Sequence, residues 1–172
     1  MSEPTPSPDQ TGSSDPTGAA SADHPGVIMR PPLLYAGTLV LAAMLERVIA
    51  LPLDIEPARW IIVAVAGALG LILAGGGTTL FRRHGTNVQT HKPSTTVVTT
   101  GPYRYSRNPI YLGLTALYVA VAVAMNSGWA LIGLAPLLLV MRNGVIAREE
   151  RYLEAKFGEA YRAYKARVRR WL

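Results

Sequence analysis

Four long apolar blocks constrain the fold of this chain more than any other feature of its sequence. Polar loops and one long polar linker separate the blocks, which cover Leu33–Leu53, Trp60–Leu80, Ile110–Met125 and Trp129–Met141. Blocks of this length and purity exceed what the core of a water-soluble domain requires, and about 20 apolar residues in a helix cross a bilayer. The sequence therefore predicts an all-α, polytopic membrane protein with about four transmembrane helices.

The two ends of the chain differ from the apolar blocks. The first 26 residues contain no Val, Ile, Leu or aromatic residue, so residues 1–28 are predicted to form a disordered tail and residues 29–172 the membrane-embedded domain. Near the other end, apolar residues recur at helical spacing among basic ones: Leu153, Phe157, Tyr161, Tyr164, Val168 and Trp171. This pattern predicts a C-terminal amphipathic cytoplasmic helix on an anionic membrane surface, which Gly158 would divide in two.

Basic residues set the expected orientation. Fourteen of the 17 Lys and Arg residues lie between Arg82 and Arg170, in segments that flank the apolar blocks. Because basic loops mark the cytoplasmic side, we expect a multi-pass protein of the cell inner membrane with its active site and both termini in the cytoplasm. The same distribution argues for membrane lipids and against nucleic acid as partners. The oligomeric state stays open, although Gly75–Gly77 predict a kink or a close neighbouring helix.

Several chemistries are excluded by what the sequence lacks. Cysteine is absent, and His24, His84 and His91 do not have metal-binding spacing, so no metal site is expected. Neither a dinucleotide fingerprint nor a phosphate-binding loop occurs. Polar side chains instead gather at the predicted cytoplasmic helix ends: Gln89, His91, Tyr103, Tyr105, Arg107, Asn108, Arg142, Asn143, Arg148, Glu149 and Glu150. By spacing alone they fit a structural ion-pair network as well as an active site.

Two stretches of the chain resemble the isoprenylcysteine carboxyl methyltransferase family. The first, residues 97–113, reads Val-Val-Thr-Thr-Gly-Pro-Tyr-Arg-Tyr-Ser-Arg-Asn-Pro-Ile-Tyr-Leu-Gly. The second, residues 148–164, begins Arg-Glu-Glu-Arg-Tyr-Leu and continues to Phe-Gly-Glu-Ala-Tyr-Arg-Ala-Tyr. The resemblance covers residues 60–172, and phospholipid N-methyltransferases share parts of it.

This resemblance implies an integral membrane methyltransferase whose cofactor is S-adenosyl-L-methionine. By match to the family motifs, the implied cofactor-binding residues are Gln89, Thr95, Thr96, Val97, Val98, Tyr103, Asn108, Pro109, Ile110, Tyr111 and Glu149. In this arrangement Glu149 would accept hydrogen bonds from the ribose hydroxyls or the methionyl amine, and Tyr103 or Tyr111 would face the sulfonium. The catalytic candidates are Arg107, Asn108 and Arg142.

Two positions depart from the family pattern. Asn108 replaces the family's histidine, and an asparagine amide cannot act as a general base at neutral pH. Val145 occupies the position of an arginine that contacts substrate in the family. Arg142 or Arg148, within about one helical turn, would have to replace that arginine. The first departure argues against a mechanism that requires this imidazole. The loss of the arginine weakens the case for a prenylcysteine carboxylate as the methyl acceptor.

The function predicted from the sequence is methyl transfer to a lipid-like or lipid-anchored acceptor that arrives from the bilayer. Its closest alternative is a phospholipid N-methyltransferase, and a second is a membrane reductase of related fold that uses a nicotinamide cofactor. The non-enzymatic alternative is a membrane module whose basic C-terminal helix recruits partners or anionic lipid. The reacting atom of the acceptor stays open.

Overall fold

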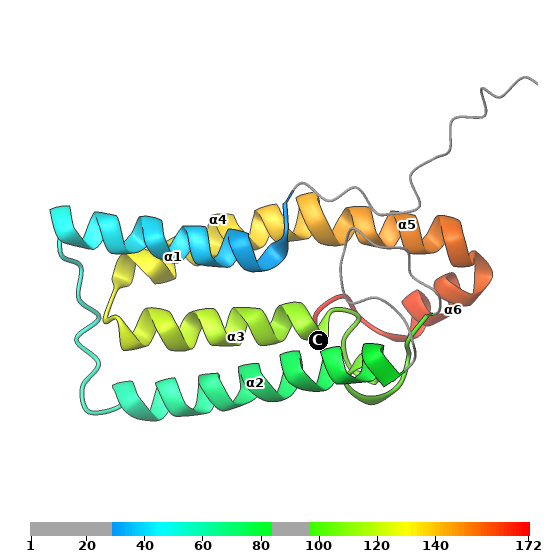
Figure 1. The fold of residues 1–172 in the computed structure, drawn as a ribbon, viewed down its shortest axis with the longest axis horizontal. Coiled ribbons are helices and arrows are strands. Elements are labelled where there is room, and N and C mark those ends of the chain that lie inside the picture. Colours follow the sequence, from blue (N-terminus) through cyan, green and yellow to red (C-terminus); the bar gives the residue numbers. More distant parts are fainter. Residues whose placement is uncertain (1–28, 84–96) are drawn as a thin grey trace, which may run out of the picture.

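The computed structural model of the chain describes residues 29–83 and 97–172, and all of the regular structure in them is helical (Figure 1). The elements are, in order, α1 (Pro31–Val48), α2 (Arg59–Arg83), η1 (Gly101–Arg104), α3 (Pro109–Ala124), α4 (Gly128–Val140), η2 (Met141–Ile146), α5 (Ala147–Phe157) and α6 (Glu159–Arg167). The predicted all-α class is confirmed. The predicted tail at residues 1–28 lies outside the described residues.

Two of the described helices are long and apolar enough to cross a membrane. One covers Arg59–Leu80 within α2, and the other runs from Gly128 to Phe157, as α4, η2 and α5 in succession. α3 is a shorter apolar helix. η2, which joins α4 to α5, is a π-helical segment inside the second long helix.

Prolines, a capping serine and a glycine account for several of the observed helix ends. Pro31 and Pro109 occupy the first positions of α1 and α3, where a missing backbone N–H breaks no helical bond. Ser127 caps α4, since its side chain accepts a hydrogen bond from Ala130 N. Gly158 has a φ of 52°, which glycine adopts without strain, and it separates α5 from α6.

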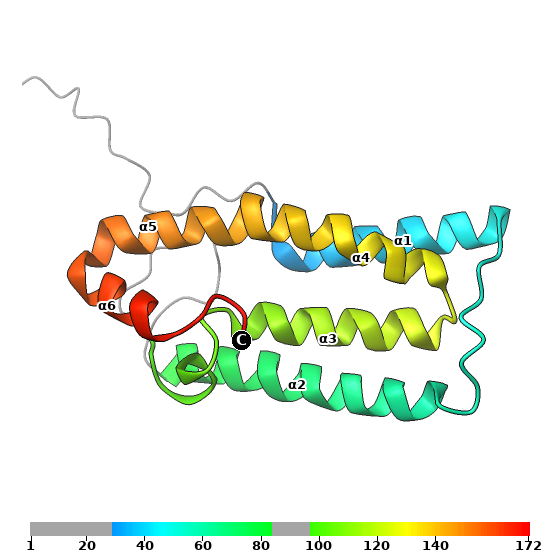
Figure 2. The same cartoon turned by 180° about the vertical axis from the view of Figure 1, so that it is seen from behind.

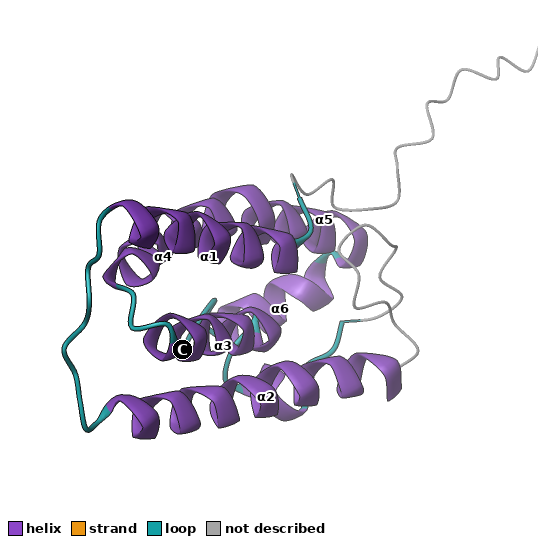
Figure 3. Ribbon diagram, turned by 60° about the vertical axis from the view of Figure 1, so that its left-hand side comes forward, coloured by secondary structure: helices purple, strands orange, loops and turns teal. Residues whose placement is uncertain are grey.

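The helices pack as two pairs, α1 with α4 and α2 with α3 (Figures 1 and 3). Glycines bring the backbones of α2 and α3 into direct contact. A Cβ atom added at Gly113 would lie 2.5 Å from Ala74 N, and one added at Gly70 would lie 2.9 Å from Gly113 O. Small residues of this kind are how membrane helices pack closely without a hydrophobic driving force between them.

The three glycines at the end of α2 keep their helical conformation. α2 continues through Gly75–Gly77 to Arg83, and the predicted close neighbour is found at the last of the three glycines. A Cβ atom at Gly77 would lie 2.6 Å from Ile110 Cγ1. The residues that follow η1 can therefore approach α2 closely at this glycine.

Two buried tyrosines join the helix pairs to each other. Tyr35 on α1 and Tyr118 on α3 are 5% and 2% exposed, and their rings meet edge to face with centroids 6.0 Å apart. The Tyr118 hydroxyl donates to Ala130 O of α4 at 2.7 Å. The Tyr35 hydroxyl lies 2.8 Å from Thr115 Oγ1 of α3. α3 is therefore fixed to both helices of the other pair.

A carboxylate from inside the first apolar block closes one end of the bundle, where the α1–α2 and α3–α4 connections lie together (Figure 2). Glu46 Oε2 accepts a hydrogen bond from Ser127 Oγ at 2.6 Å, and Glu46 Oε1 accepts one from Leu51 N at 2.6 Å. Arg59 donates to Val123 O and Ala124 O at the end of α3. Glu46 therefore has a structural role at these helix ends.

The C-terminal segment forms two helices that cover the other end of the bundle (Figure 2). The break falls at Gly158, as the sequence indicated, but the apolar stripe does not stay on one outward face. Tyr161 and Tyr164 are buried, and the Tyr164 hydroxyl donates to Tyr103 O at 2.8 Å. At these positions the predicted stripe packs on the protein itself and not on a membrane surface.

We expect Gly113→Ala to destabilise the protein in detergent by about 1–3 kcal/mol, because the added methyl group overlaps the α2 backbone. Thermal unfolding in detergent measures the effect. Gly75→Ala is the matched control, since a Cβ atom there meets nothing within 4 Å and alanine favours a helix, so its midpoint should stay or rise. Equal losses in both variants would contradict close α2–α3 packing as the source of stability.

Candidate active site

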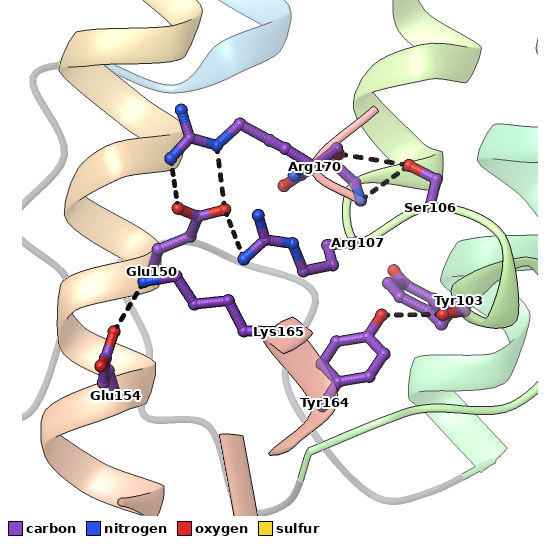
Figure 4. A network of polar contacts seen from close by, with 9 residues as sticks. Tyr103, Ser106, Arg107, Glu150, Glu154, Tyr164, Lys165 and Arg170 are labelled. Carbon is purple, nitrogen blue, oxygen red and sulfur yellow. Dashed lines mark hydrogen bonds and ion pairs between the residues drawn. The ribbon is translucent and has the colours of Figure 1, made fainter. Parts of the chain in front are cut away.

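Polar side chains from distant parts of the chain meet at the end of the bundle where α5 and α6 lie (Figure 4). We call this region the polar end; it comprises η1, residues 105–111, α5, α6 and the terminal segment 168–172. Its central charges are buried, because the side chains of Glu150 and Arg107 are only 7% and 9% exposed. Buried charges are costly unless they are paired, so their partners define how this region is built.

Glu150 is held between two arginines, and we call this arrangement the Glu150 clamp. Glu150 Oε1 lies 3.1 Å from Arg107 Nη1. Arg170 reaches both carboxylate oxygens, with Nε 3.1 Å from Oε1 and Nη2 2.5 Å from Oε2. Such two-point contact uses the planar guanidinium fork of arginine. The carboxylate thereby connects α5, the loop before α3 and the terminal segment (Figure 4).

Hydrogen bonds fasten the terminal segment to the start of α3. Arg107 N donates to Arg169 O at 3.0 Å, Asn108 Nδ2 donates to Arg170 O at 2.9 Å, and Ser106 Oγ donates to Arg170 O at 3.4 Å. The side chain of Asn108 is therefore engaged in holding the terminal segment.

Glu149 reaches a different partner from its neighbour Glu150. Successive residues of an α-helix point about 100° apart, so the two carboxylates face different parts of the bundle. The Tyr111 hydroxyl donates to Glu149 Oε1 at 2.6 Å, which joins α3 to α5. A carboxyl group has two oxygens and several acceptor positions, of which Tyr111 uses one, so Glu149 retains capacity for further donors.

Tyr103 lies close to this pair. Burial, and to a smaller extent Tyr164 and the Glu149 carboxylate, raises the pKa of Tyr103 well above its ordinary value. Its phenol therefore stays neutral throughout the physiological pH range. On the α2 side, Gly77 lies close to this hydroxyl: a Cβ atom added at the glycine would be 3.6 Å from it, an ordinary contact distance.

The structure brings most of the described candidate residues together at the polar end: Tyr103, Arg107, Asn108, Pro109, Ile110, Tyr111 and Glu149. Val97 and Val98 lead toward η1, and Val98 is buried. Arg142 is exposed on η2, whereas Val145 on the same segment is fully buried in the core. Three candidates lie outside the described residues: Gln89, Thr95 and Thr96.

Sequence reasoning missed the contributions of Arg170, Tyr161 and Tyr164 to the polar end. The two tyrosines did give a signal, since they belong to the apolar stripe, but such a stripe can face lipid or protein. Arg170 belongs to the closing Val-Arg-Arg-Trp stretch, residues 168–171, which also fits the resembled family, but spacing does not distinguish one arginine of this basic run from another. Its role emerges only from its contact with Glu150.

Comparisons with known proteins concern the part of the chain that contains most of these residues. The sequence model of a family described as phospholipid methyltransferase matches residues 59–160, more than half of the chain, and the matched range contains Tyr103, Tyr111 and Glu149. An uncharacterised protein of Haemophilus influenzae is 44% identical over 63 residues, which are 37% of this chain and 100% of that protein. No solved structure matches the chain. The family match confirms the kind of membrane methyltransferase that the two sequence stretches resemble.

We expect Glu150→Gln to destabilise the protein by about 3–5 kcal/mol, because two guanidiniums at the clamp lose their carboxylate. Thermal unfolding in detergent measures the change. Glu159→Gln is the matched control: it removes the same charge from a side chain that is 83% exposed and paired with Arg162. An exposed pair contributes about 0–1 kcal/mol, so this midpoint should hardly move. If Glu150→Gln unfolded at the control's temperature, the clamp would not be holding the polar end.

Proposed function

Because the chain belongs to the phospholipid methyltransferase family of membrane methyltransferases, we propose that it transfers a methyl group from S-adenosylmethionine to a lipid-like or lipid-anchored acceptor. The observation that carries the proposal is the contact between Tyr111 and Glu149, beside Tyr103 and within the matched range. This cluster offers one carboxylate and two aromatic rings at a single place. These groups complement the positive charges and hydroxyls of S-adenosylmethionine.

The residues proposed to hold S-adenosylmethionine are Glu149, Tyr103 and Tyr111. Glu149 would accept a hydrogen bond from the methionyl ammonium or a ribose hydroxyl, in addition to the one from Tyr111. The rings of Tyr103 and Tyr111 would attract the positive sulfonium by cation–π interaction. The backbone N–H groups of Ile110 and Tyr111, which follow Pro109 in the first turn of α3, would favour the methionyl carboxylate. The neutral phenol of Tyr103 fits this assignment.

Bound S-adenosylmethionine supplies an electrophilic methyl group. The work left to the protein is to orient the two reactants and keep water away. The burial of Tyr103 and the terminal segment fastened by the Glu150 clamp both serve that end. Asn108 is proposed to position the terminal segment and not to remove a proton, since its amide donates to Arg170 O and has no basic nitrogen.

For the acceptor, a phospholipid amine is the second candidate beside a prenylcysteine carboxylate. The observation that favours the amine is Val145, which is apolar and fully buried where the resembled family has an arginine for substrate. Alkali separates the two products after transfer of a labelled methyl group: a methyl ester is released as methanol, whereas a methylamine keeps the label. The family match favours either transfer over the reductase alternative.

We also propose a four-span arrangement in which α1, α2, α3 and α4 cross the membrane. The basic side chains of α5, α6 and the terminal segment support a cytoplasmic location for the polar end, with the protein in the cell inner membrane. The oligomeric state is left open in this proposal. Entry of the acceptor is then lateral, from the lipid around the bundle.

We expect the full chain, purified in detergent, to bind S-adenosylmethionine in calorimetry and not NADPH. Glu149→Gln should raise the Kd about 10- to 100-fold, because a hydrogen bond to a charged carboxylate contributes about 1.5–3 kcal/mol. Glu159→Gln, with the same charge change at an exposed position, should bind as the unchanged protein does. Unaltered binding by Glu149→Gln would remove Glu149 from the cofactor site, and absence of binding in the unchanged protein would refute the proposed activity.

The proposed orientation predicts that two introduced cysteines differ in their labelling by a maleimide. The chain has no cysteine of its own, so each variant reports on a single position. Ala58→Cys, an exposed position just before α2, should react with a membrane-impermeant maleimide in intact spheroplasts. Ala166→Cys, an exposed position on α6, should react only after lysis. The cysteine-free protein is the control, and the reverse order of labelling would invert the topology.

A further inference from the structure

A side chain of α1 reaches the first turn of α3, although α1 lies outside the range matched by the family model. Tyr35 is 5% exposed, and its hydroxyl lies 2.8 Å from Thr115 Oγ1 and 3.5 Å from Tyr111 O. Thr115 Oγ1 in turn donates to Tyr111 O at 2.8 Å. Tyr111 is the residue whose hydroxyl bonds Glu149.

The number of protons on each hydroxyl indicates which group donates in each of these hydrogen bonds. A threonine hydroxyl has one proton, and the proton of Thr115 is directed at the Tyr111 carbonyl. The 2.8 Å contact between the two hydroxyls then uses the proton of Tyr35, whose hydroxyl also donates to Tyr111 O at the longer distance of 3.5 Å. The result is a relay from Tyr35 through Thr115 to the Tyr111 backbone, in which each bond polarises the next.

We propose that Tyr35 is a positioning residue of the methyltransferase site, which it serves by holding Tyr111 in place for Glu149. This inference rests on the proposed function, since it concerns the cofactor site assigned above. The relay fixes the backbone of Tyr111 from the α1 side, and the phenol of the same residue reaches α5 on the other side. α1 is therefore part of the site's framework and not only a membrane anchor.

Tyr118 provides a matched comparison for the test. Both tyrosines are buried, and their rings contact each other. The Tyr118 hydroxyl also makes a buried hydrogen bond, at 2.7 Å, but its acceptor is Ala130 O on α4. Tyr35→Phe and Tyr118→Phe therefore remove the same group from the same core. Only the first change touches the relay to Tyr111.

The experiment compares S-adenosylmethionine binding by calorimetry and unfolding temperature without ligand, on the full chain in detergent. We expect Tyr35→Phe to raise the Kd about three- to tenfold, the effect of one buried neutral hydrogen bond, and Tyr118→Phe to leave it unchanged. Both variants should unfold at similarly lowered temperatures, so stability alone does not explain the difference. Thr115→Ser, which keeps the hydroxyl, should bind as the unchanged protein does, while Thr115→Val should follow Tyr35→Phe.

Every other outcome contradicts either this inference or the proposed function. If the unchanged protein binds S-adenosylmethionine and Tyr35→Phe binds it equally well, the inference is wrong and the proposed function stands. Equal weakening in Tyr35→Phe and Tyr118→Phe also overturns the inference, because the effect is then one of general stability. If the folded, unchanged protein does not bind, the proposed function fails and the inference fails with it.

Discussion

One buried carboxylate holds the polar end of this bundle together. Glu150 is almost removed from water, and a charge in that position is tolerated only because Arg107 and Arg170 surround it. The three residues lie on three separate segments of the chain: α5, the loop before α3 and the terminal segment. The hydrogen bonds from Asn108 and Ser106 to Arg170 O reinforce the same connection. The positions of Tyr103 and Tyr111 follow from it, because both lie on the chain that the clamp holds.

The packing of the long helices supplies the second constraint, which is the position of α3 among them. Glycine contacts fix α3 against α2, and the hydroxyls of Tyr118 and Tyr35 fix it against α4 and α1. α3 therefore contacts every other long helix of the described structure. The first turn of α3 also carries Tyr111, so the packing of α3 brings this residue to the polar end. The final placement of Tyr111 depends on the contacts that reach the residue itself, from Glu149 on α5 and from Tyr35 on α1.

The sequence predicts the positions of the helices better than it predicts which side chains contact one another. Apolar blocks and the prolines at 31 and 109 locate the helices, and Gly158 locates the break between α5 and α6. Motif resemblance selects Tyr103, Tyr111 and Glu149, which do meet. Spacing cannot show that Tyr161 and Tyr164 face inward, since a helical stripe looks alike whether lipid or protein covers it. Tyr35 is missed for a related reason: its significance lies in a contact across 76 residues of sequence.

The π-helical segment η2 changes which residue of α5 faces the bundle. A regular α-helix continued from α4 would present a different residue there. In a regular α-helix, eleven residues bring the chain back to within about 20° of the same face, so Arg148 would lie in line with the buried Leu137. A π turn takes up about one additional residue, which moves that place to the next position. In the structure Arg148 is exposed, and Glu149 is the residue that turns toward Tyr111. The irregular segment thus turns Glu149, and not Arg148, toward Tyr111, and it leaves Glu150, one residue on, to the arginines of the clamp.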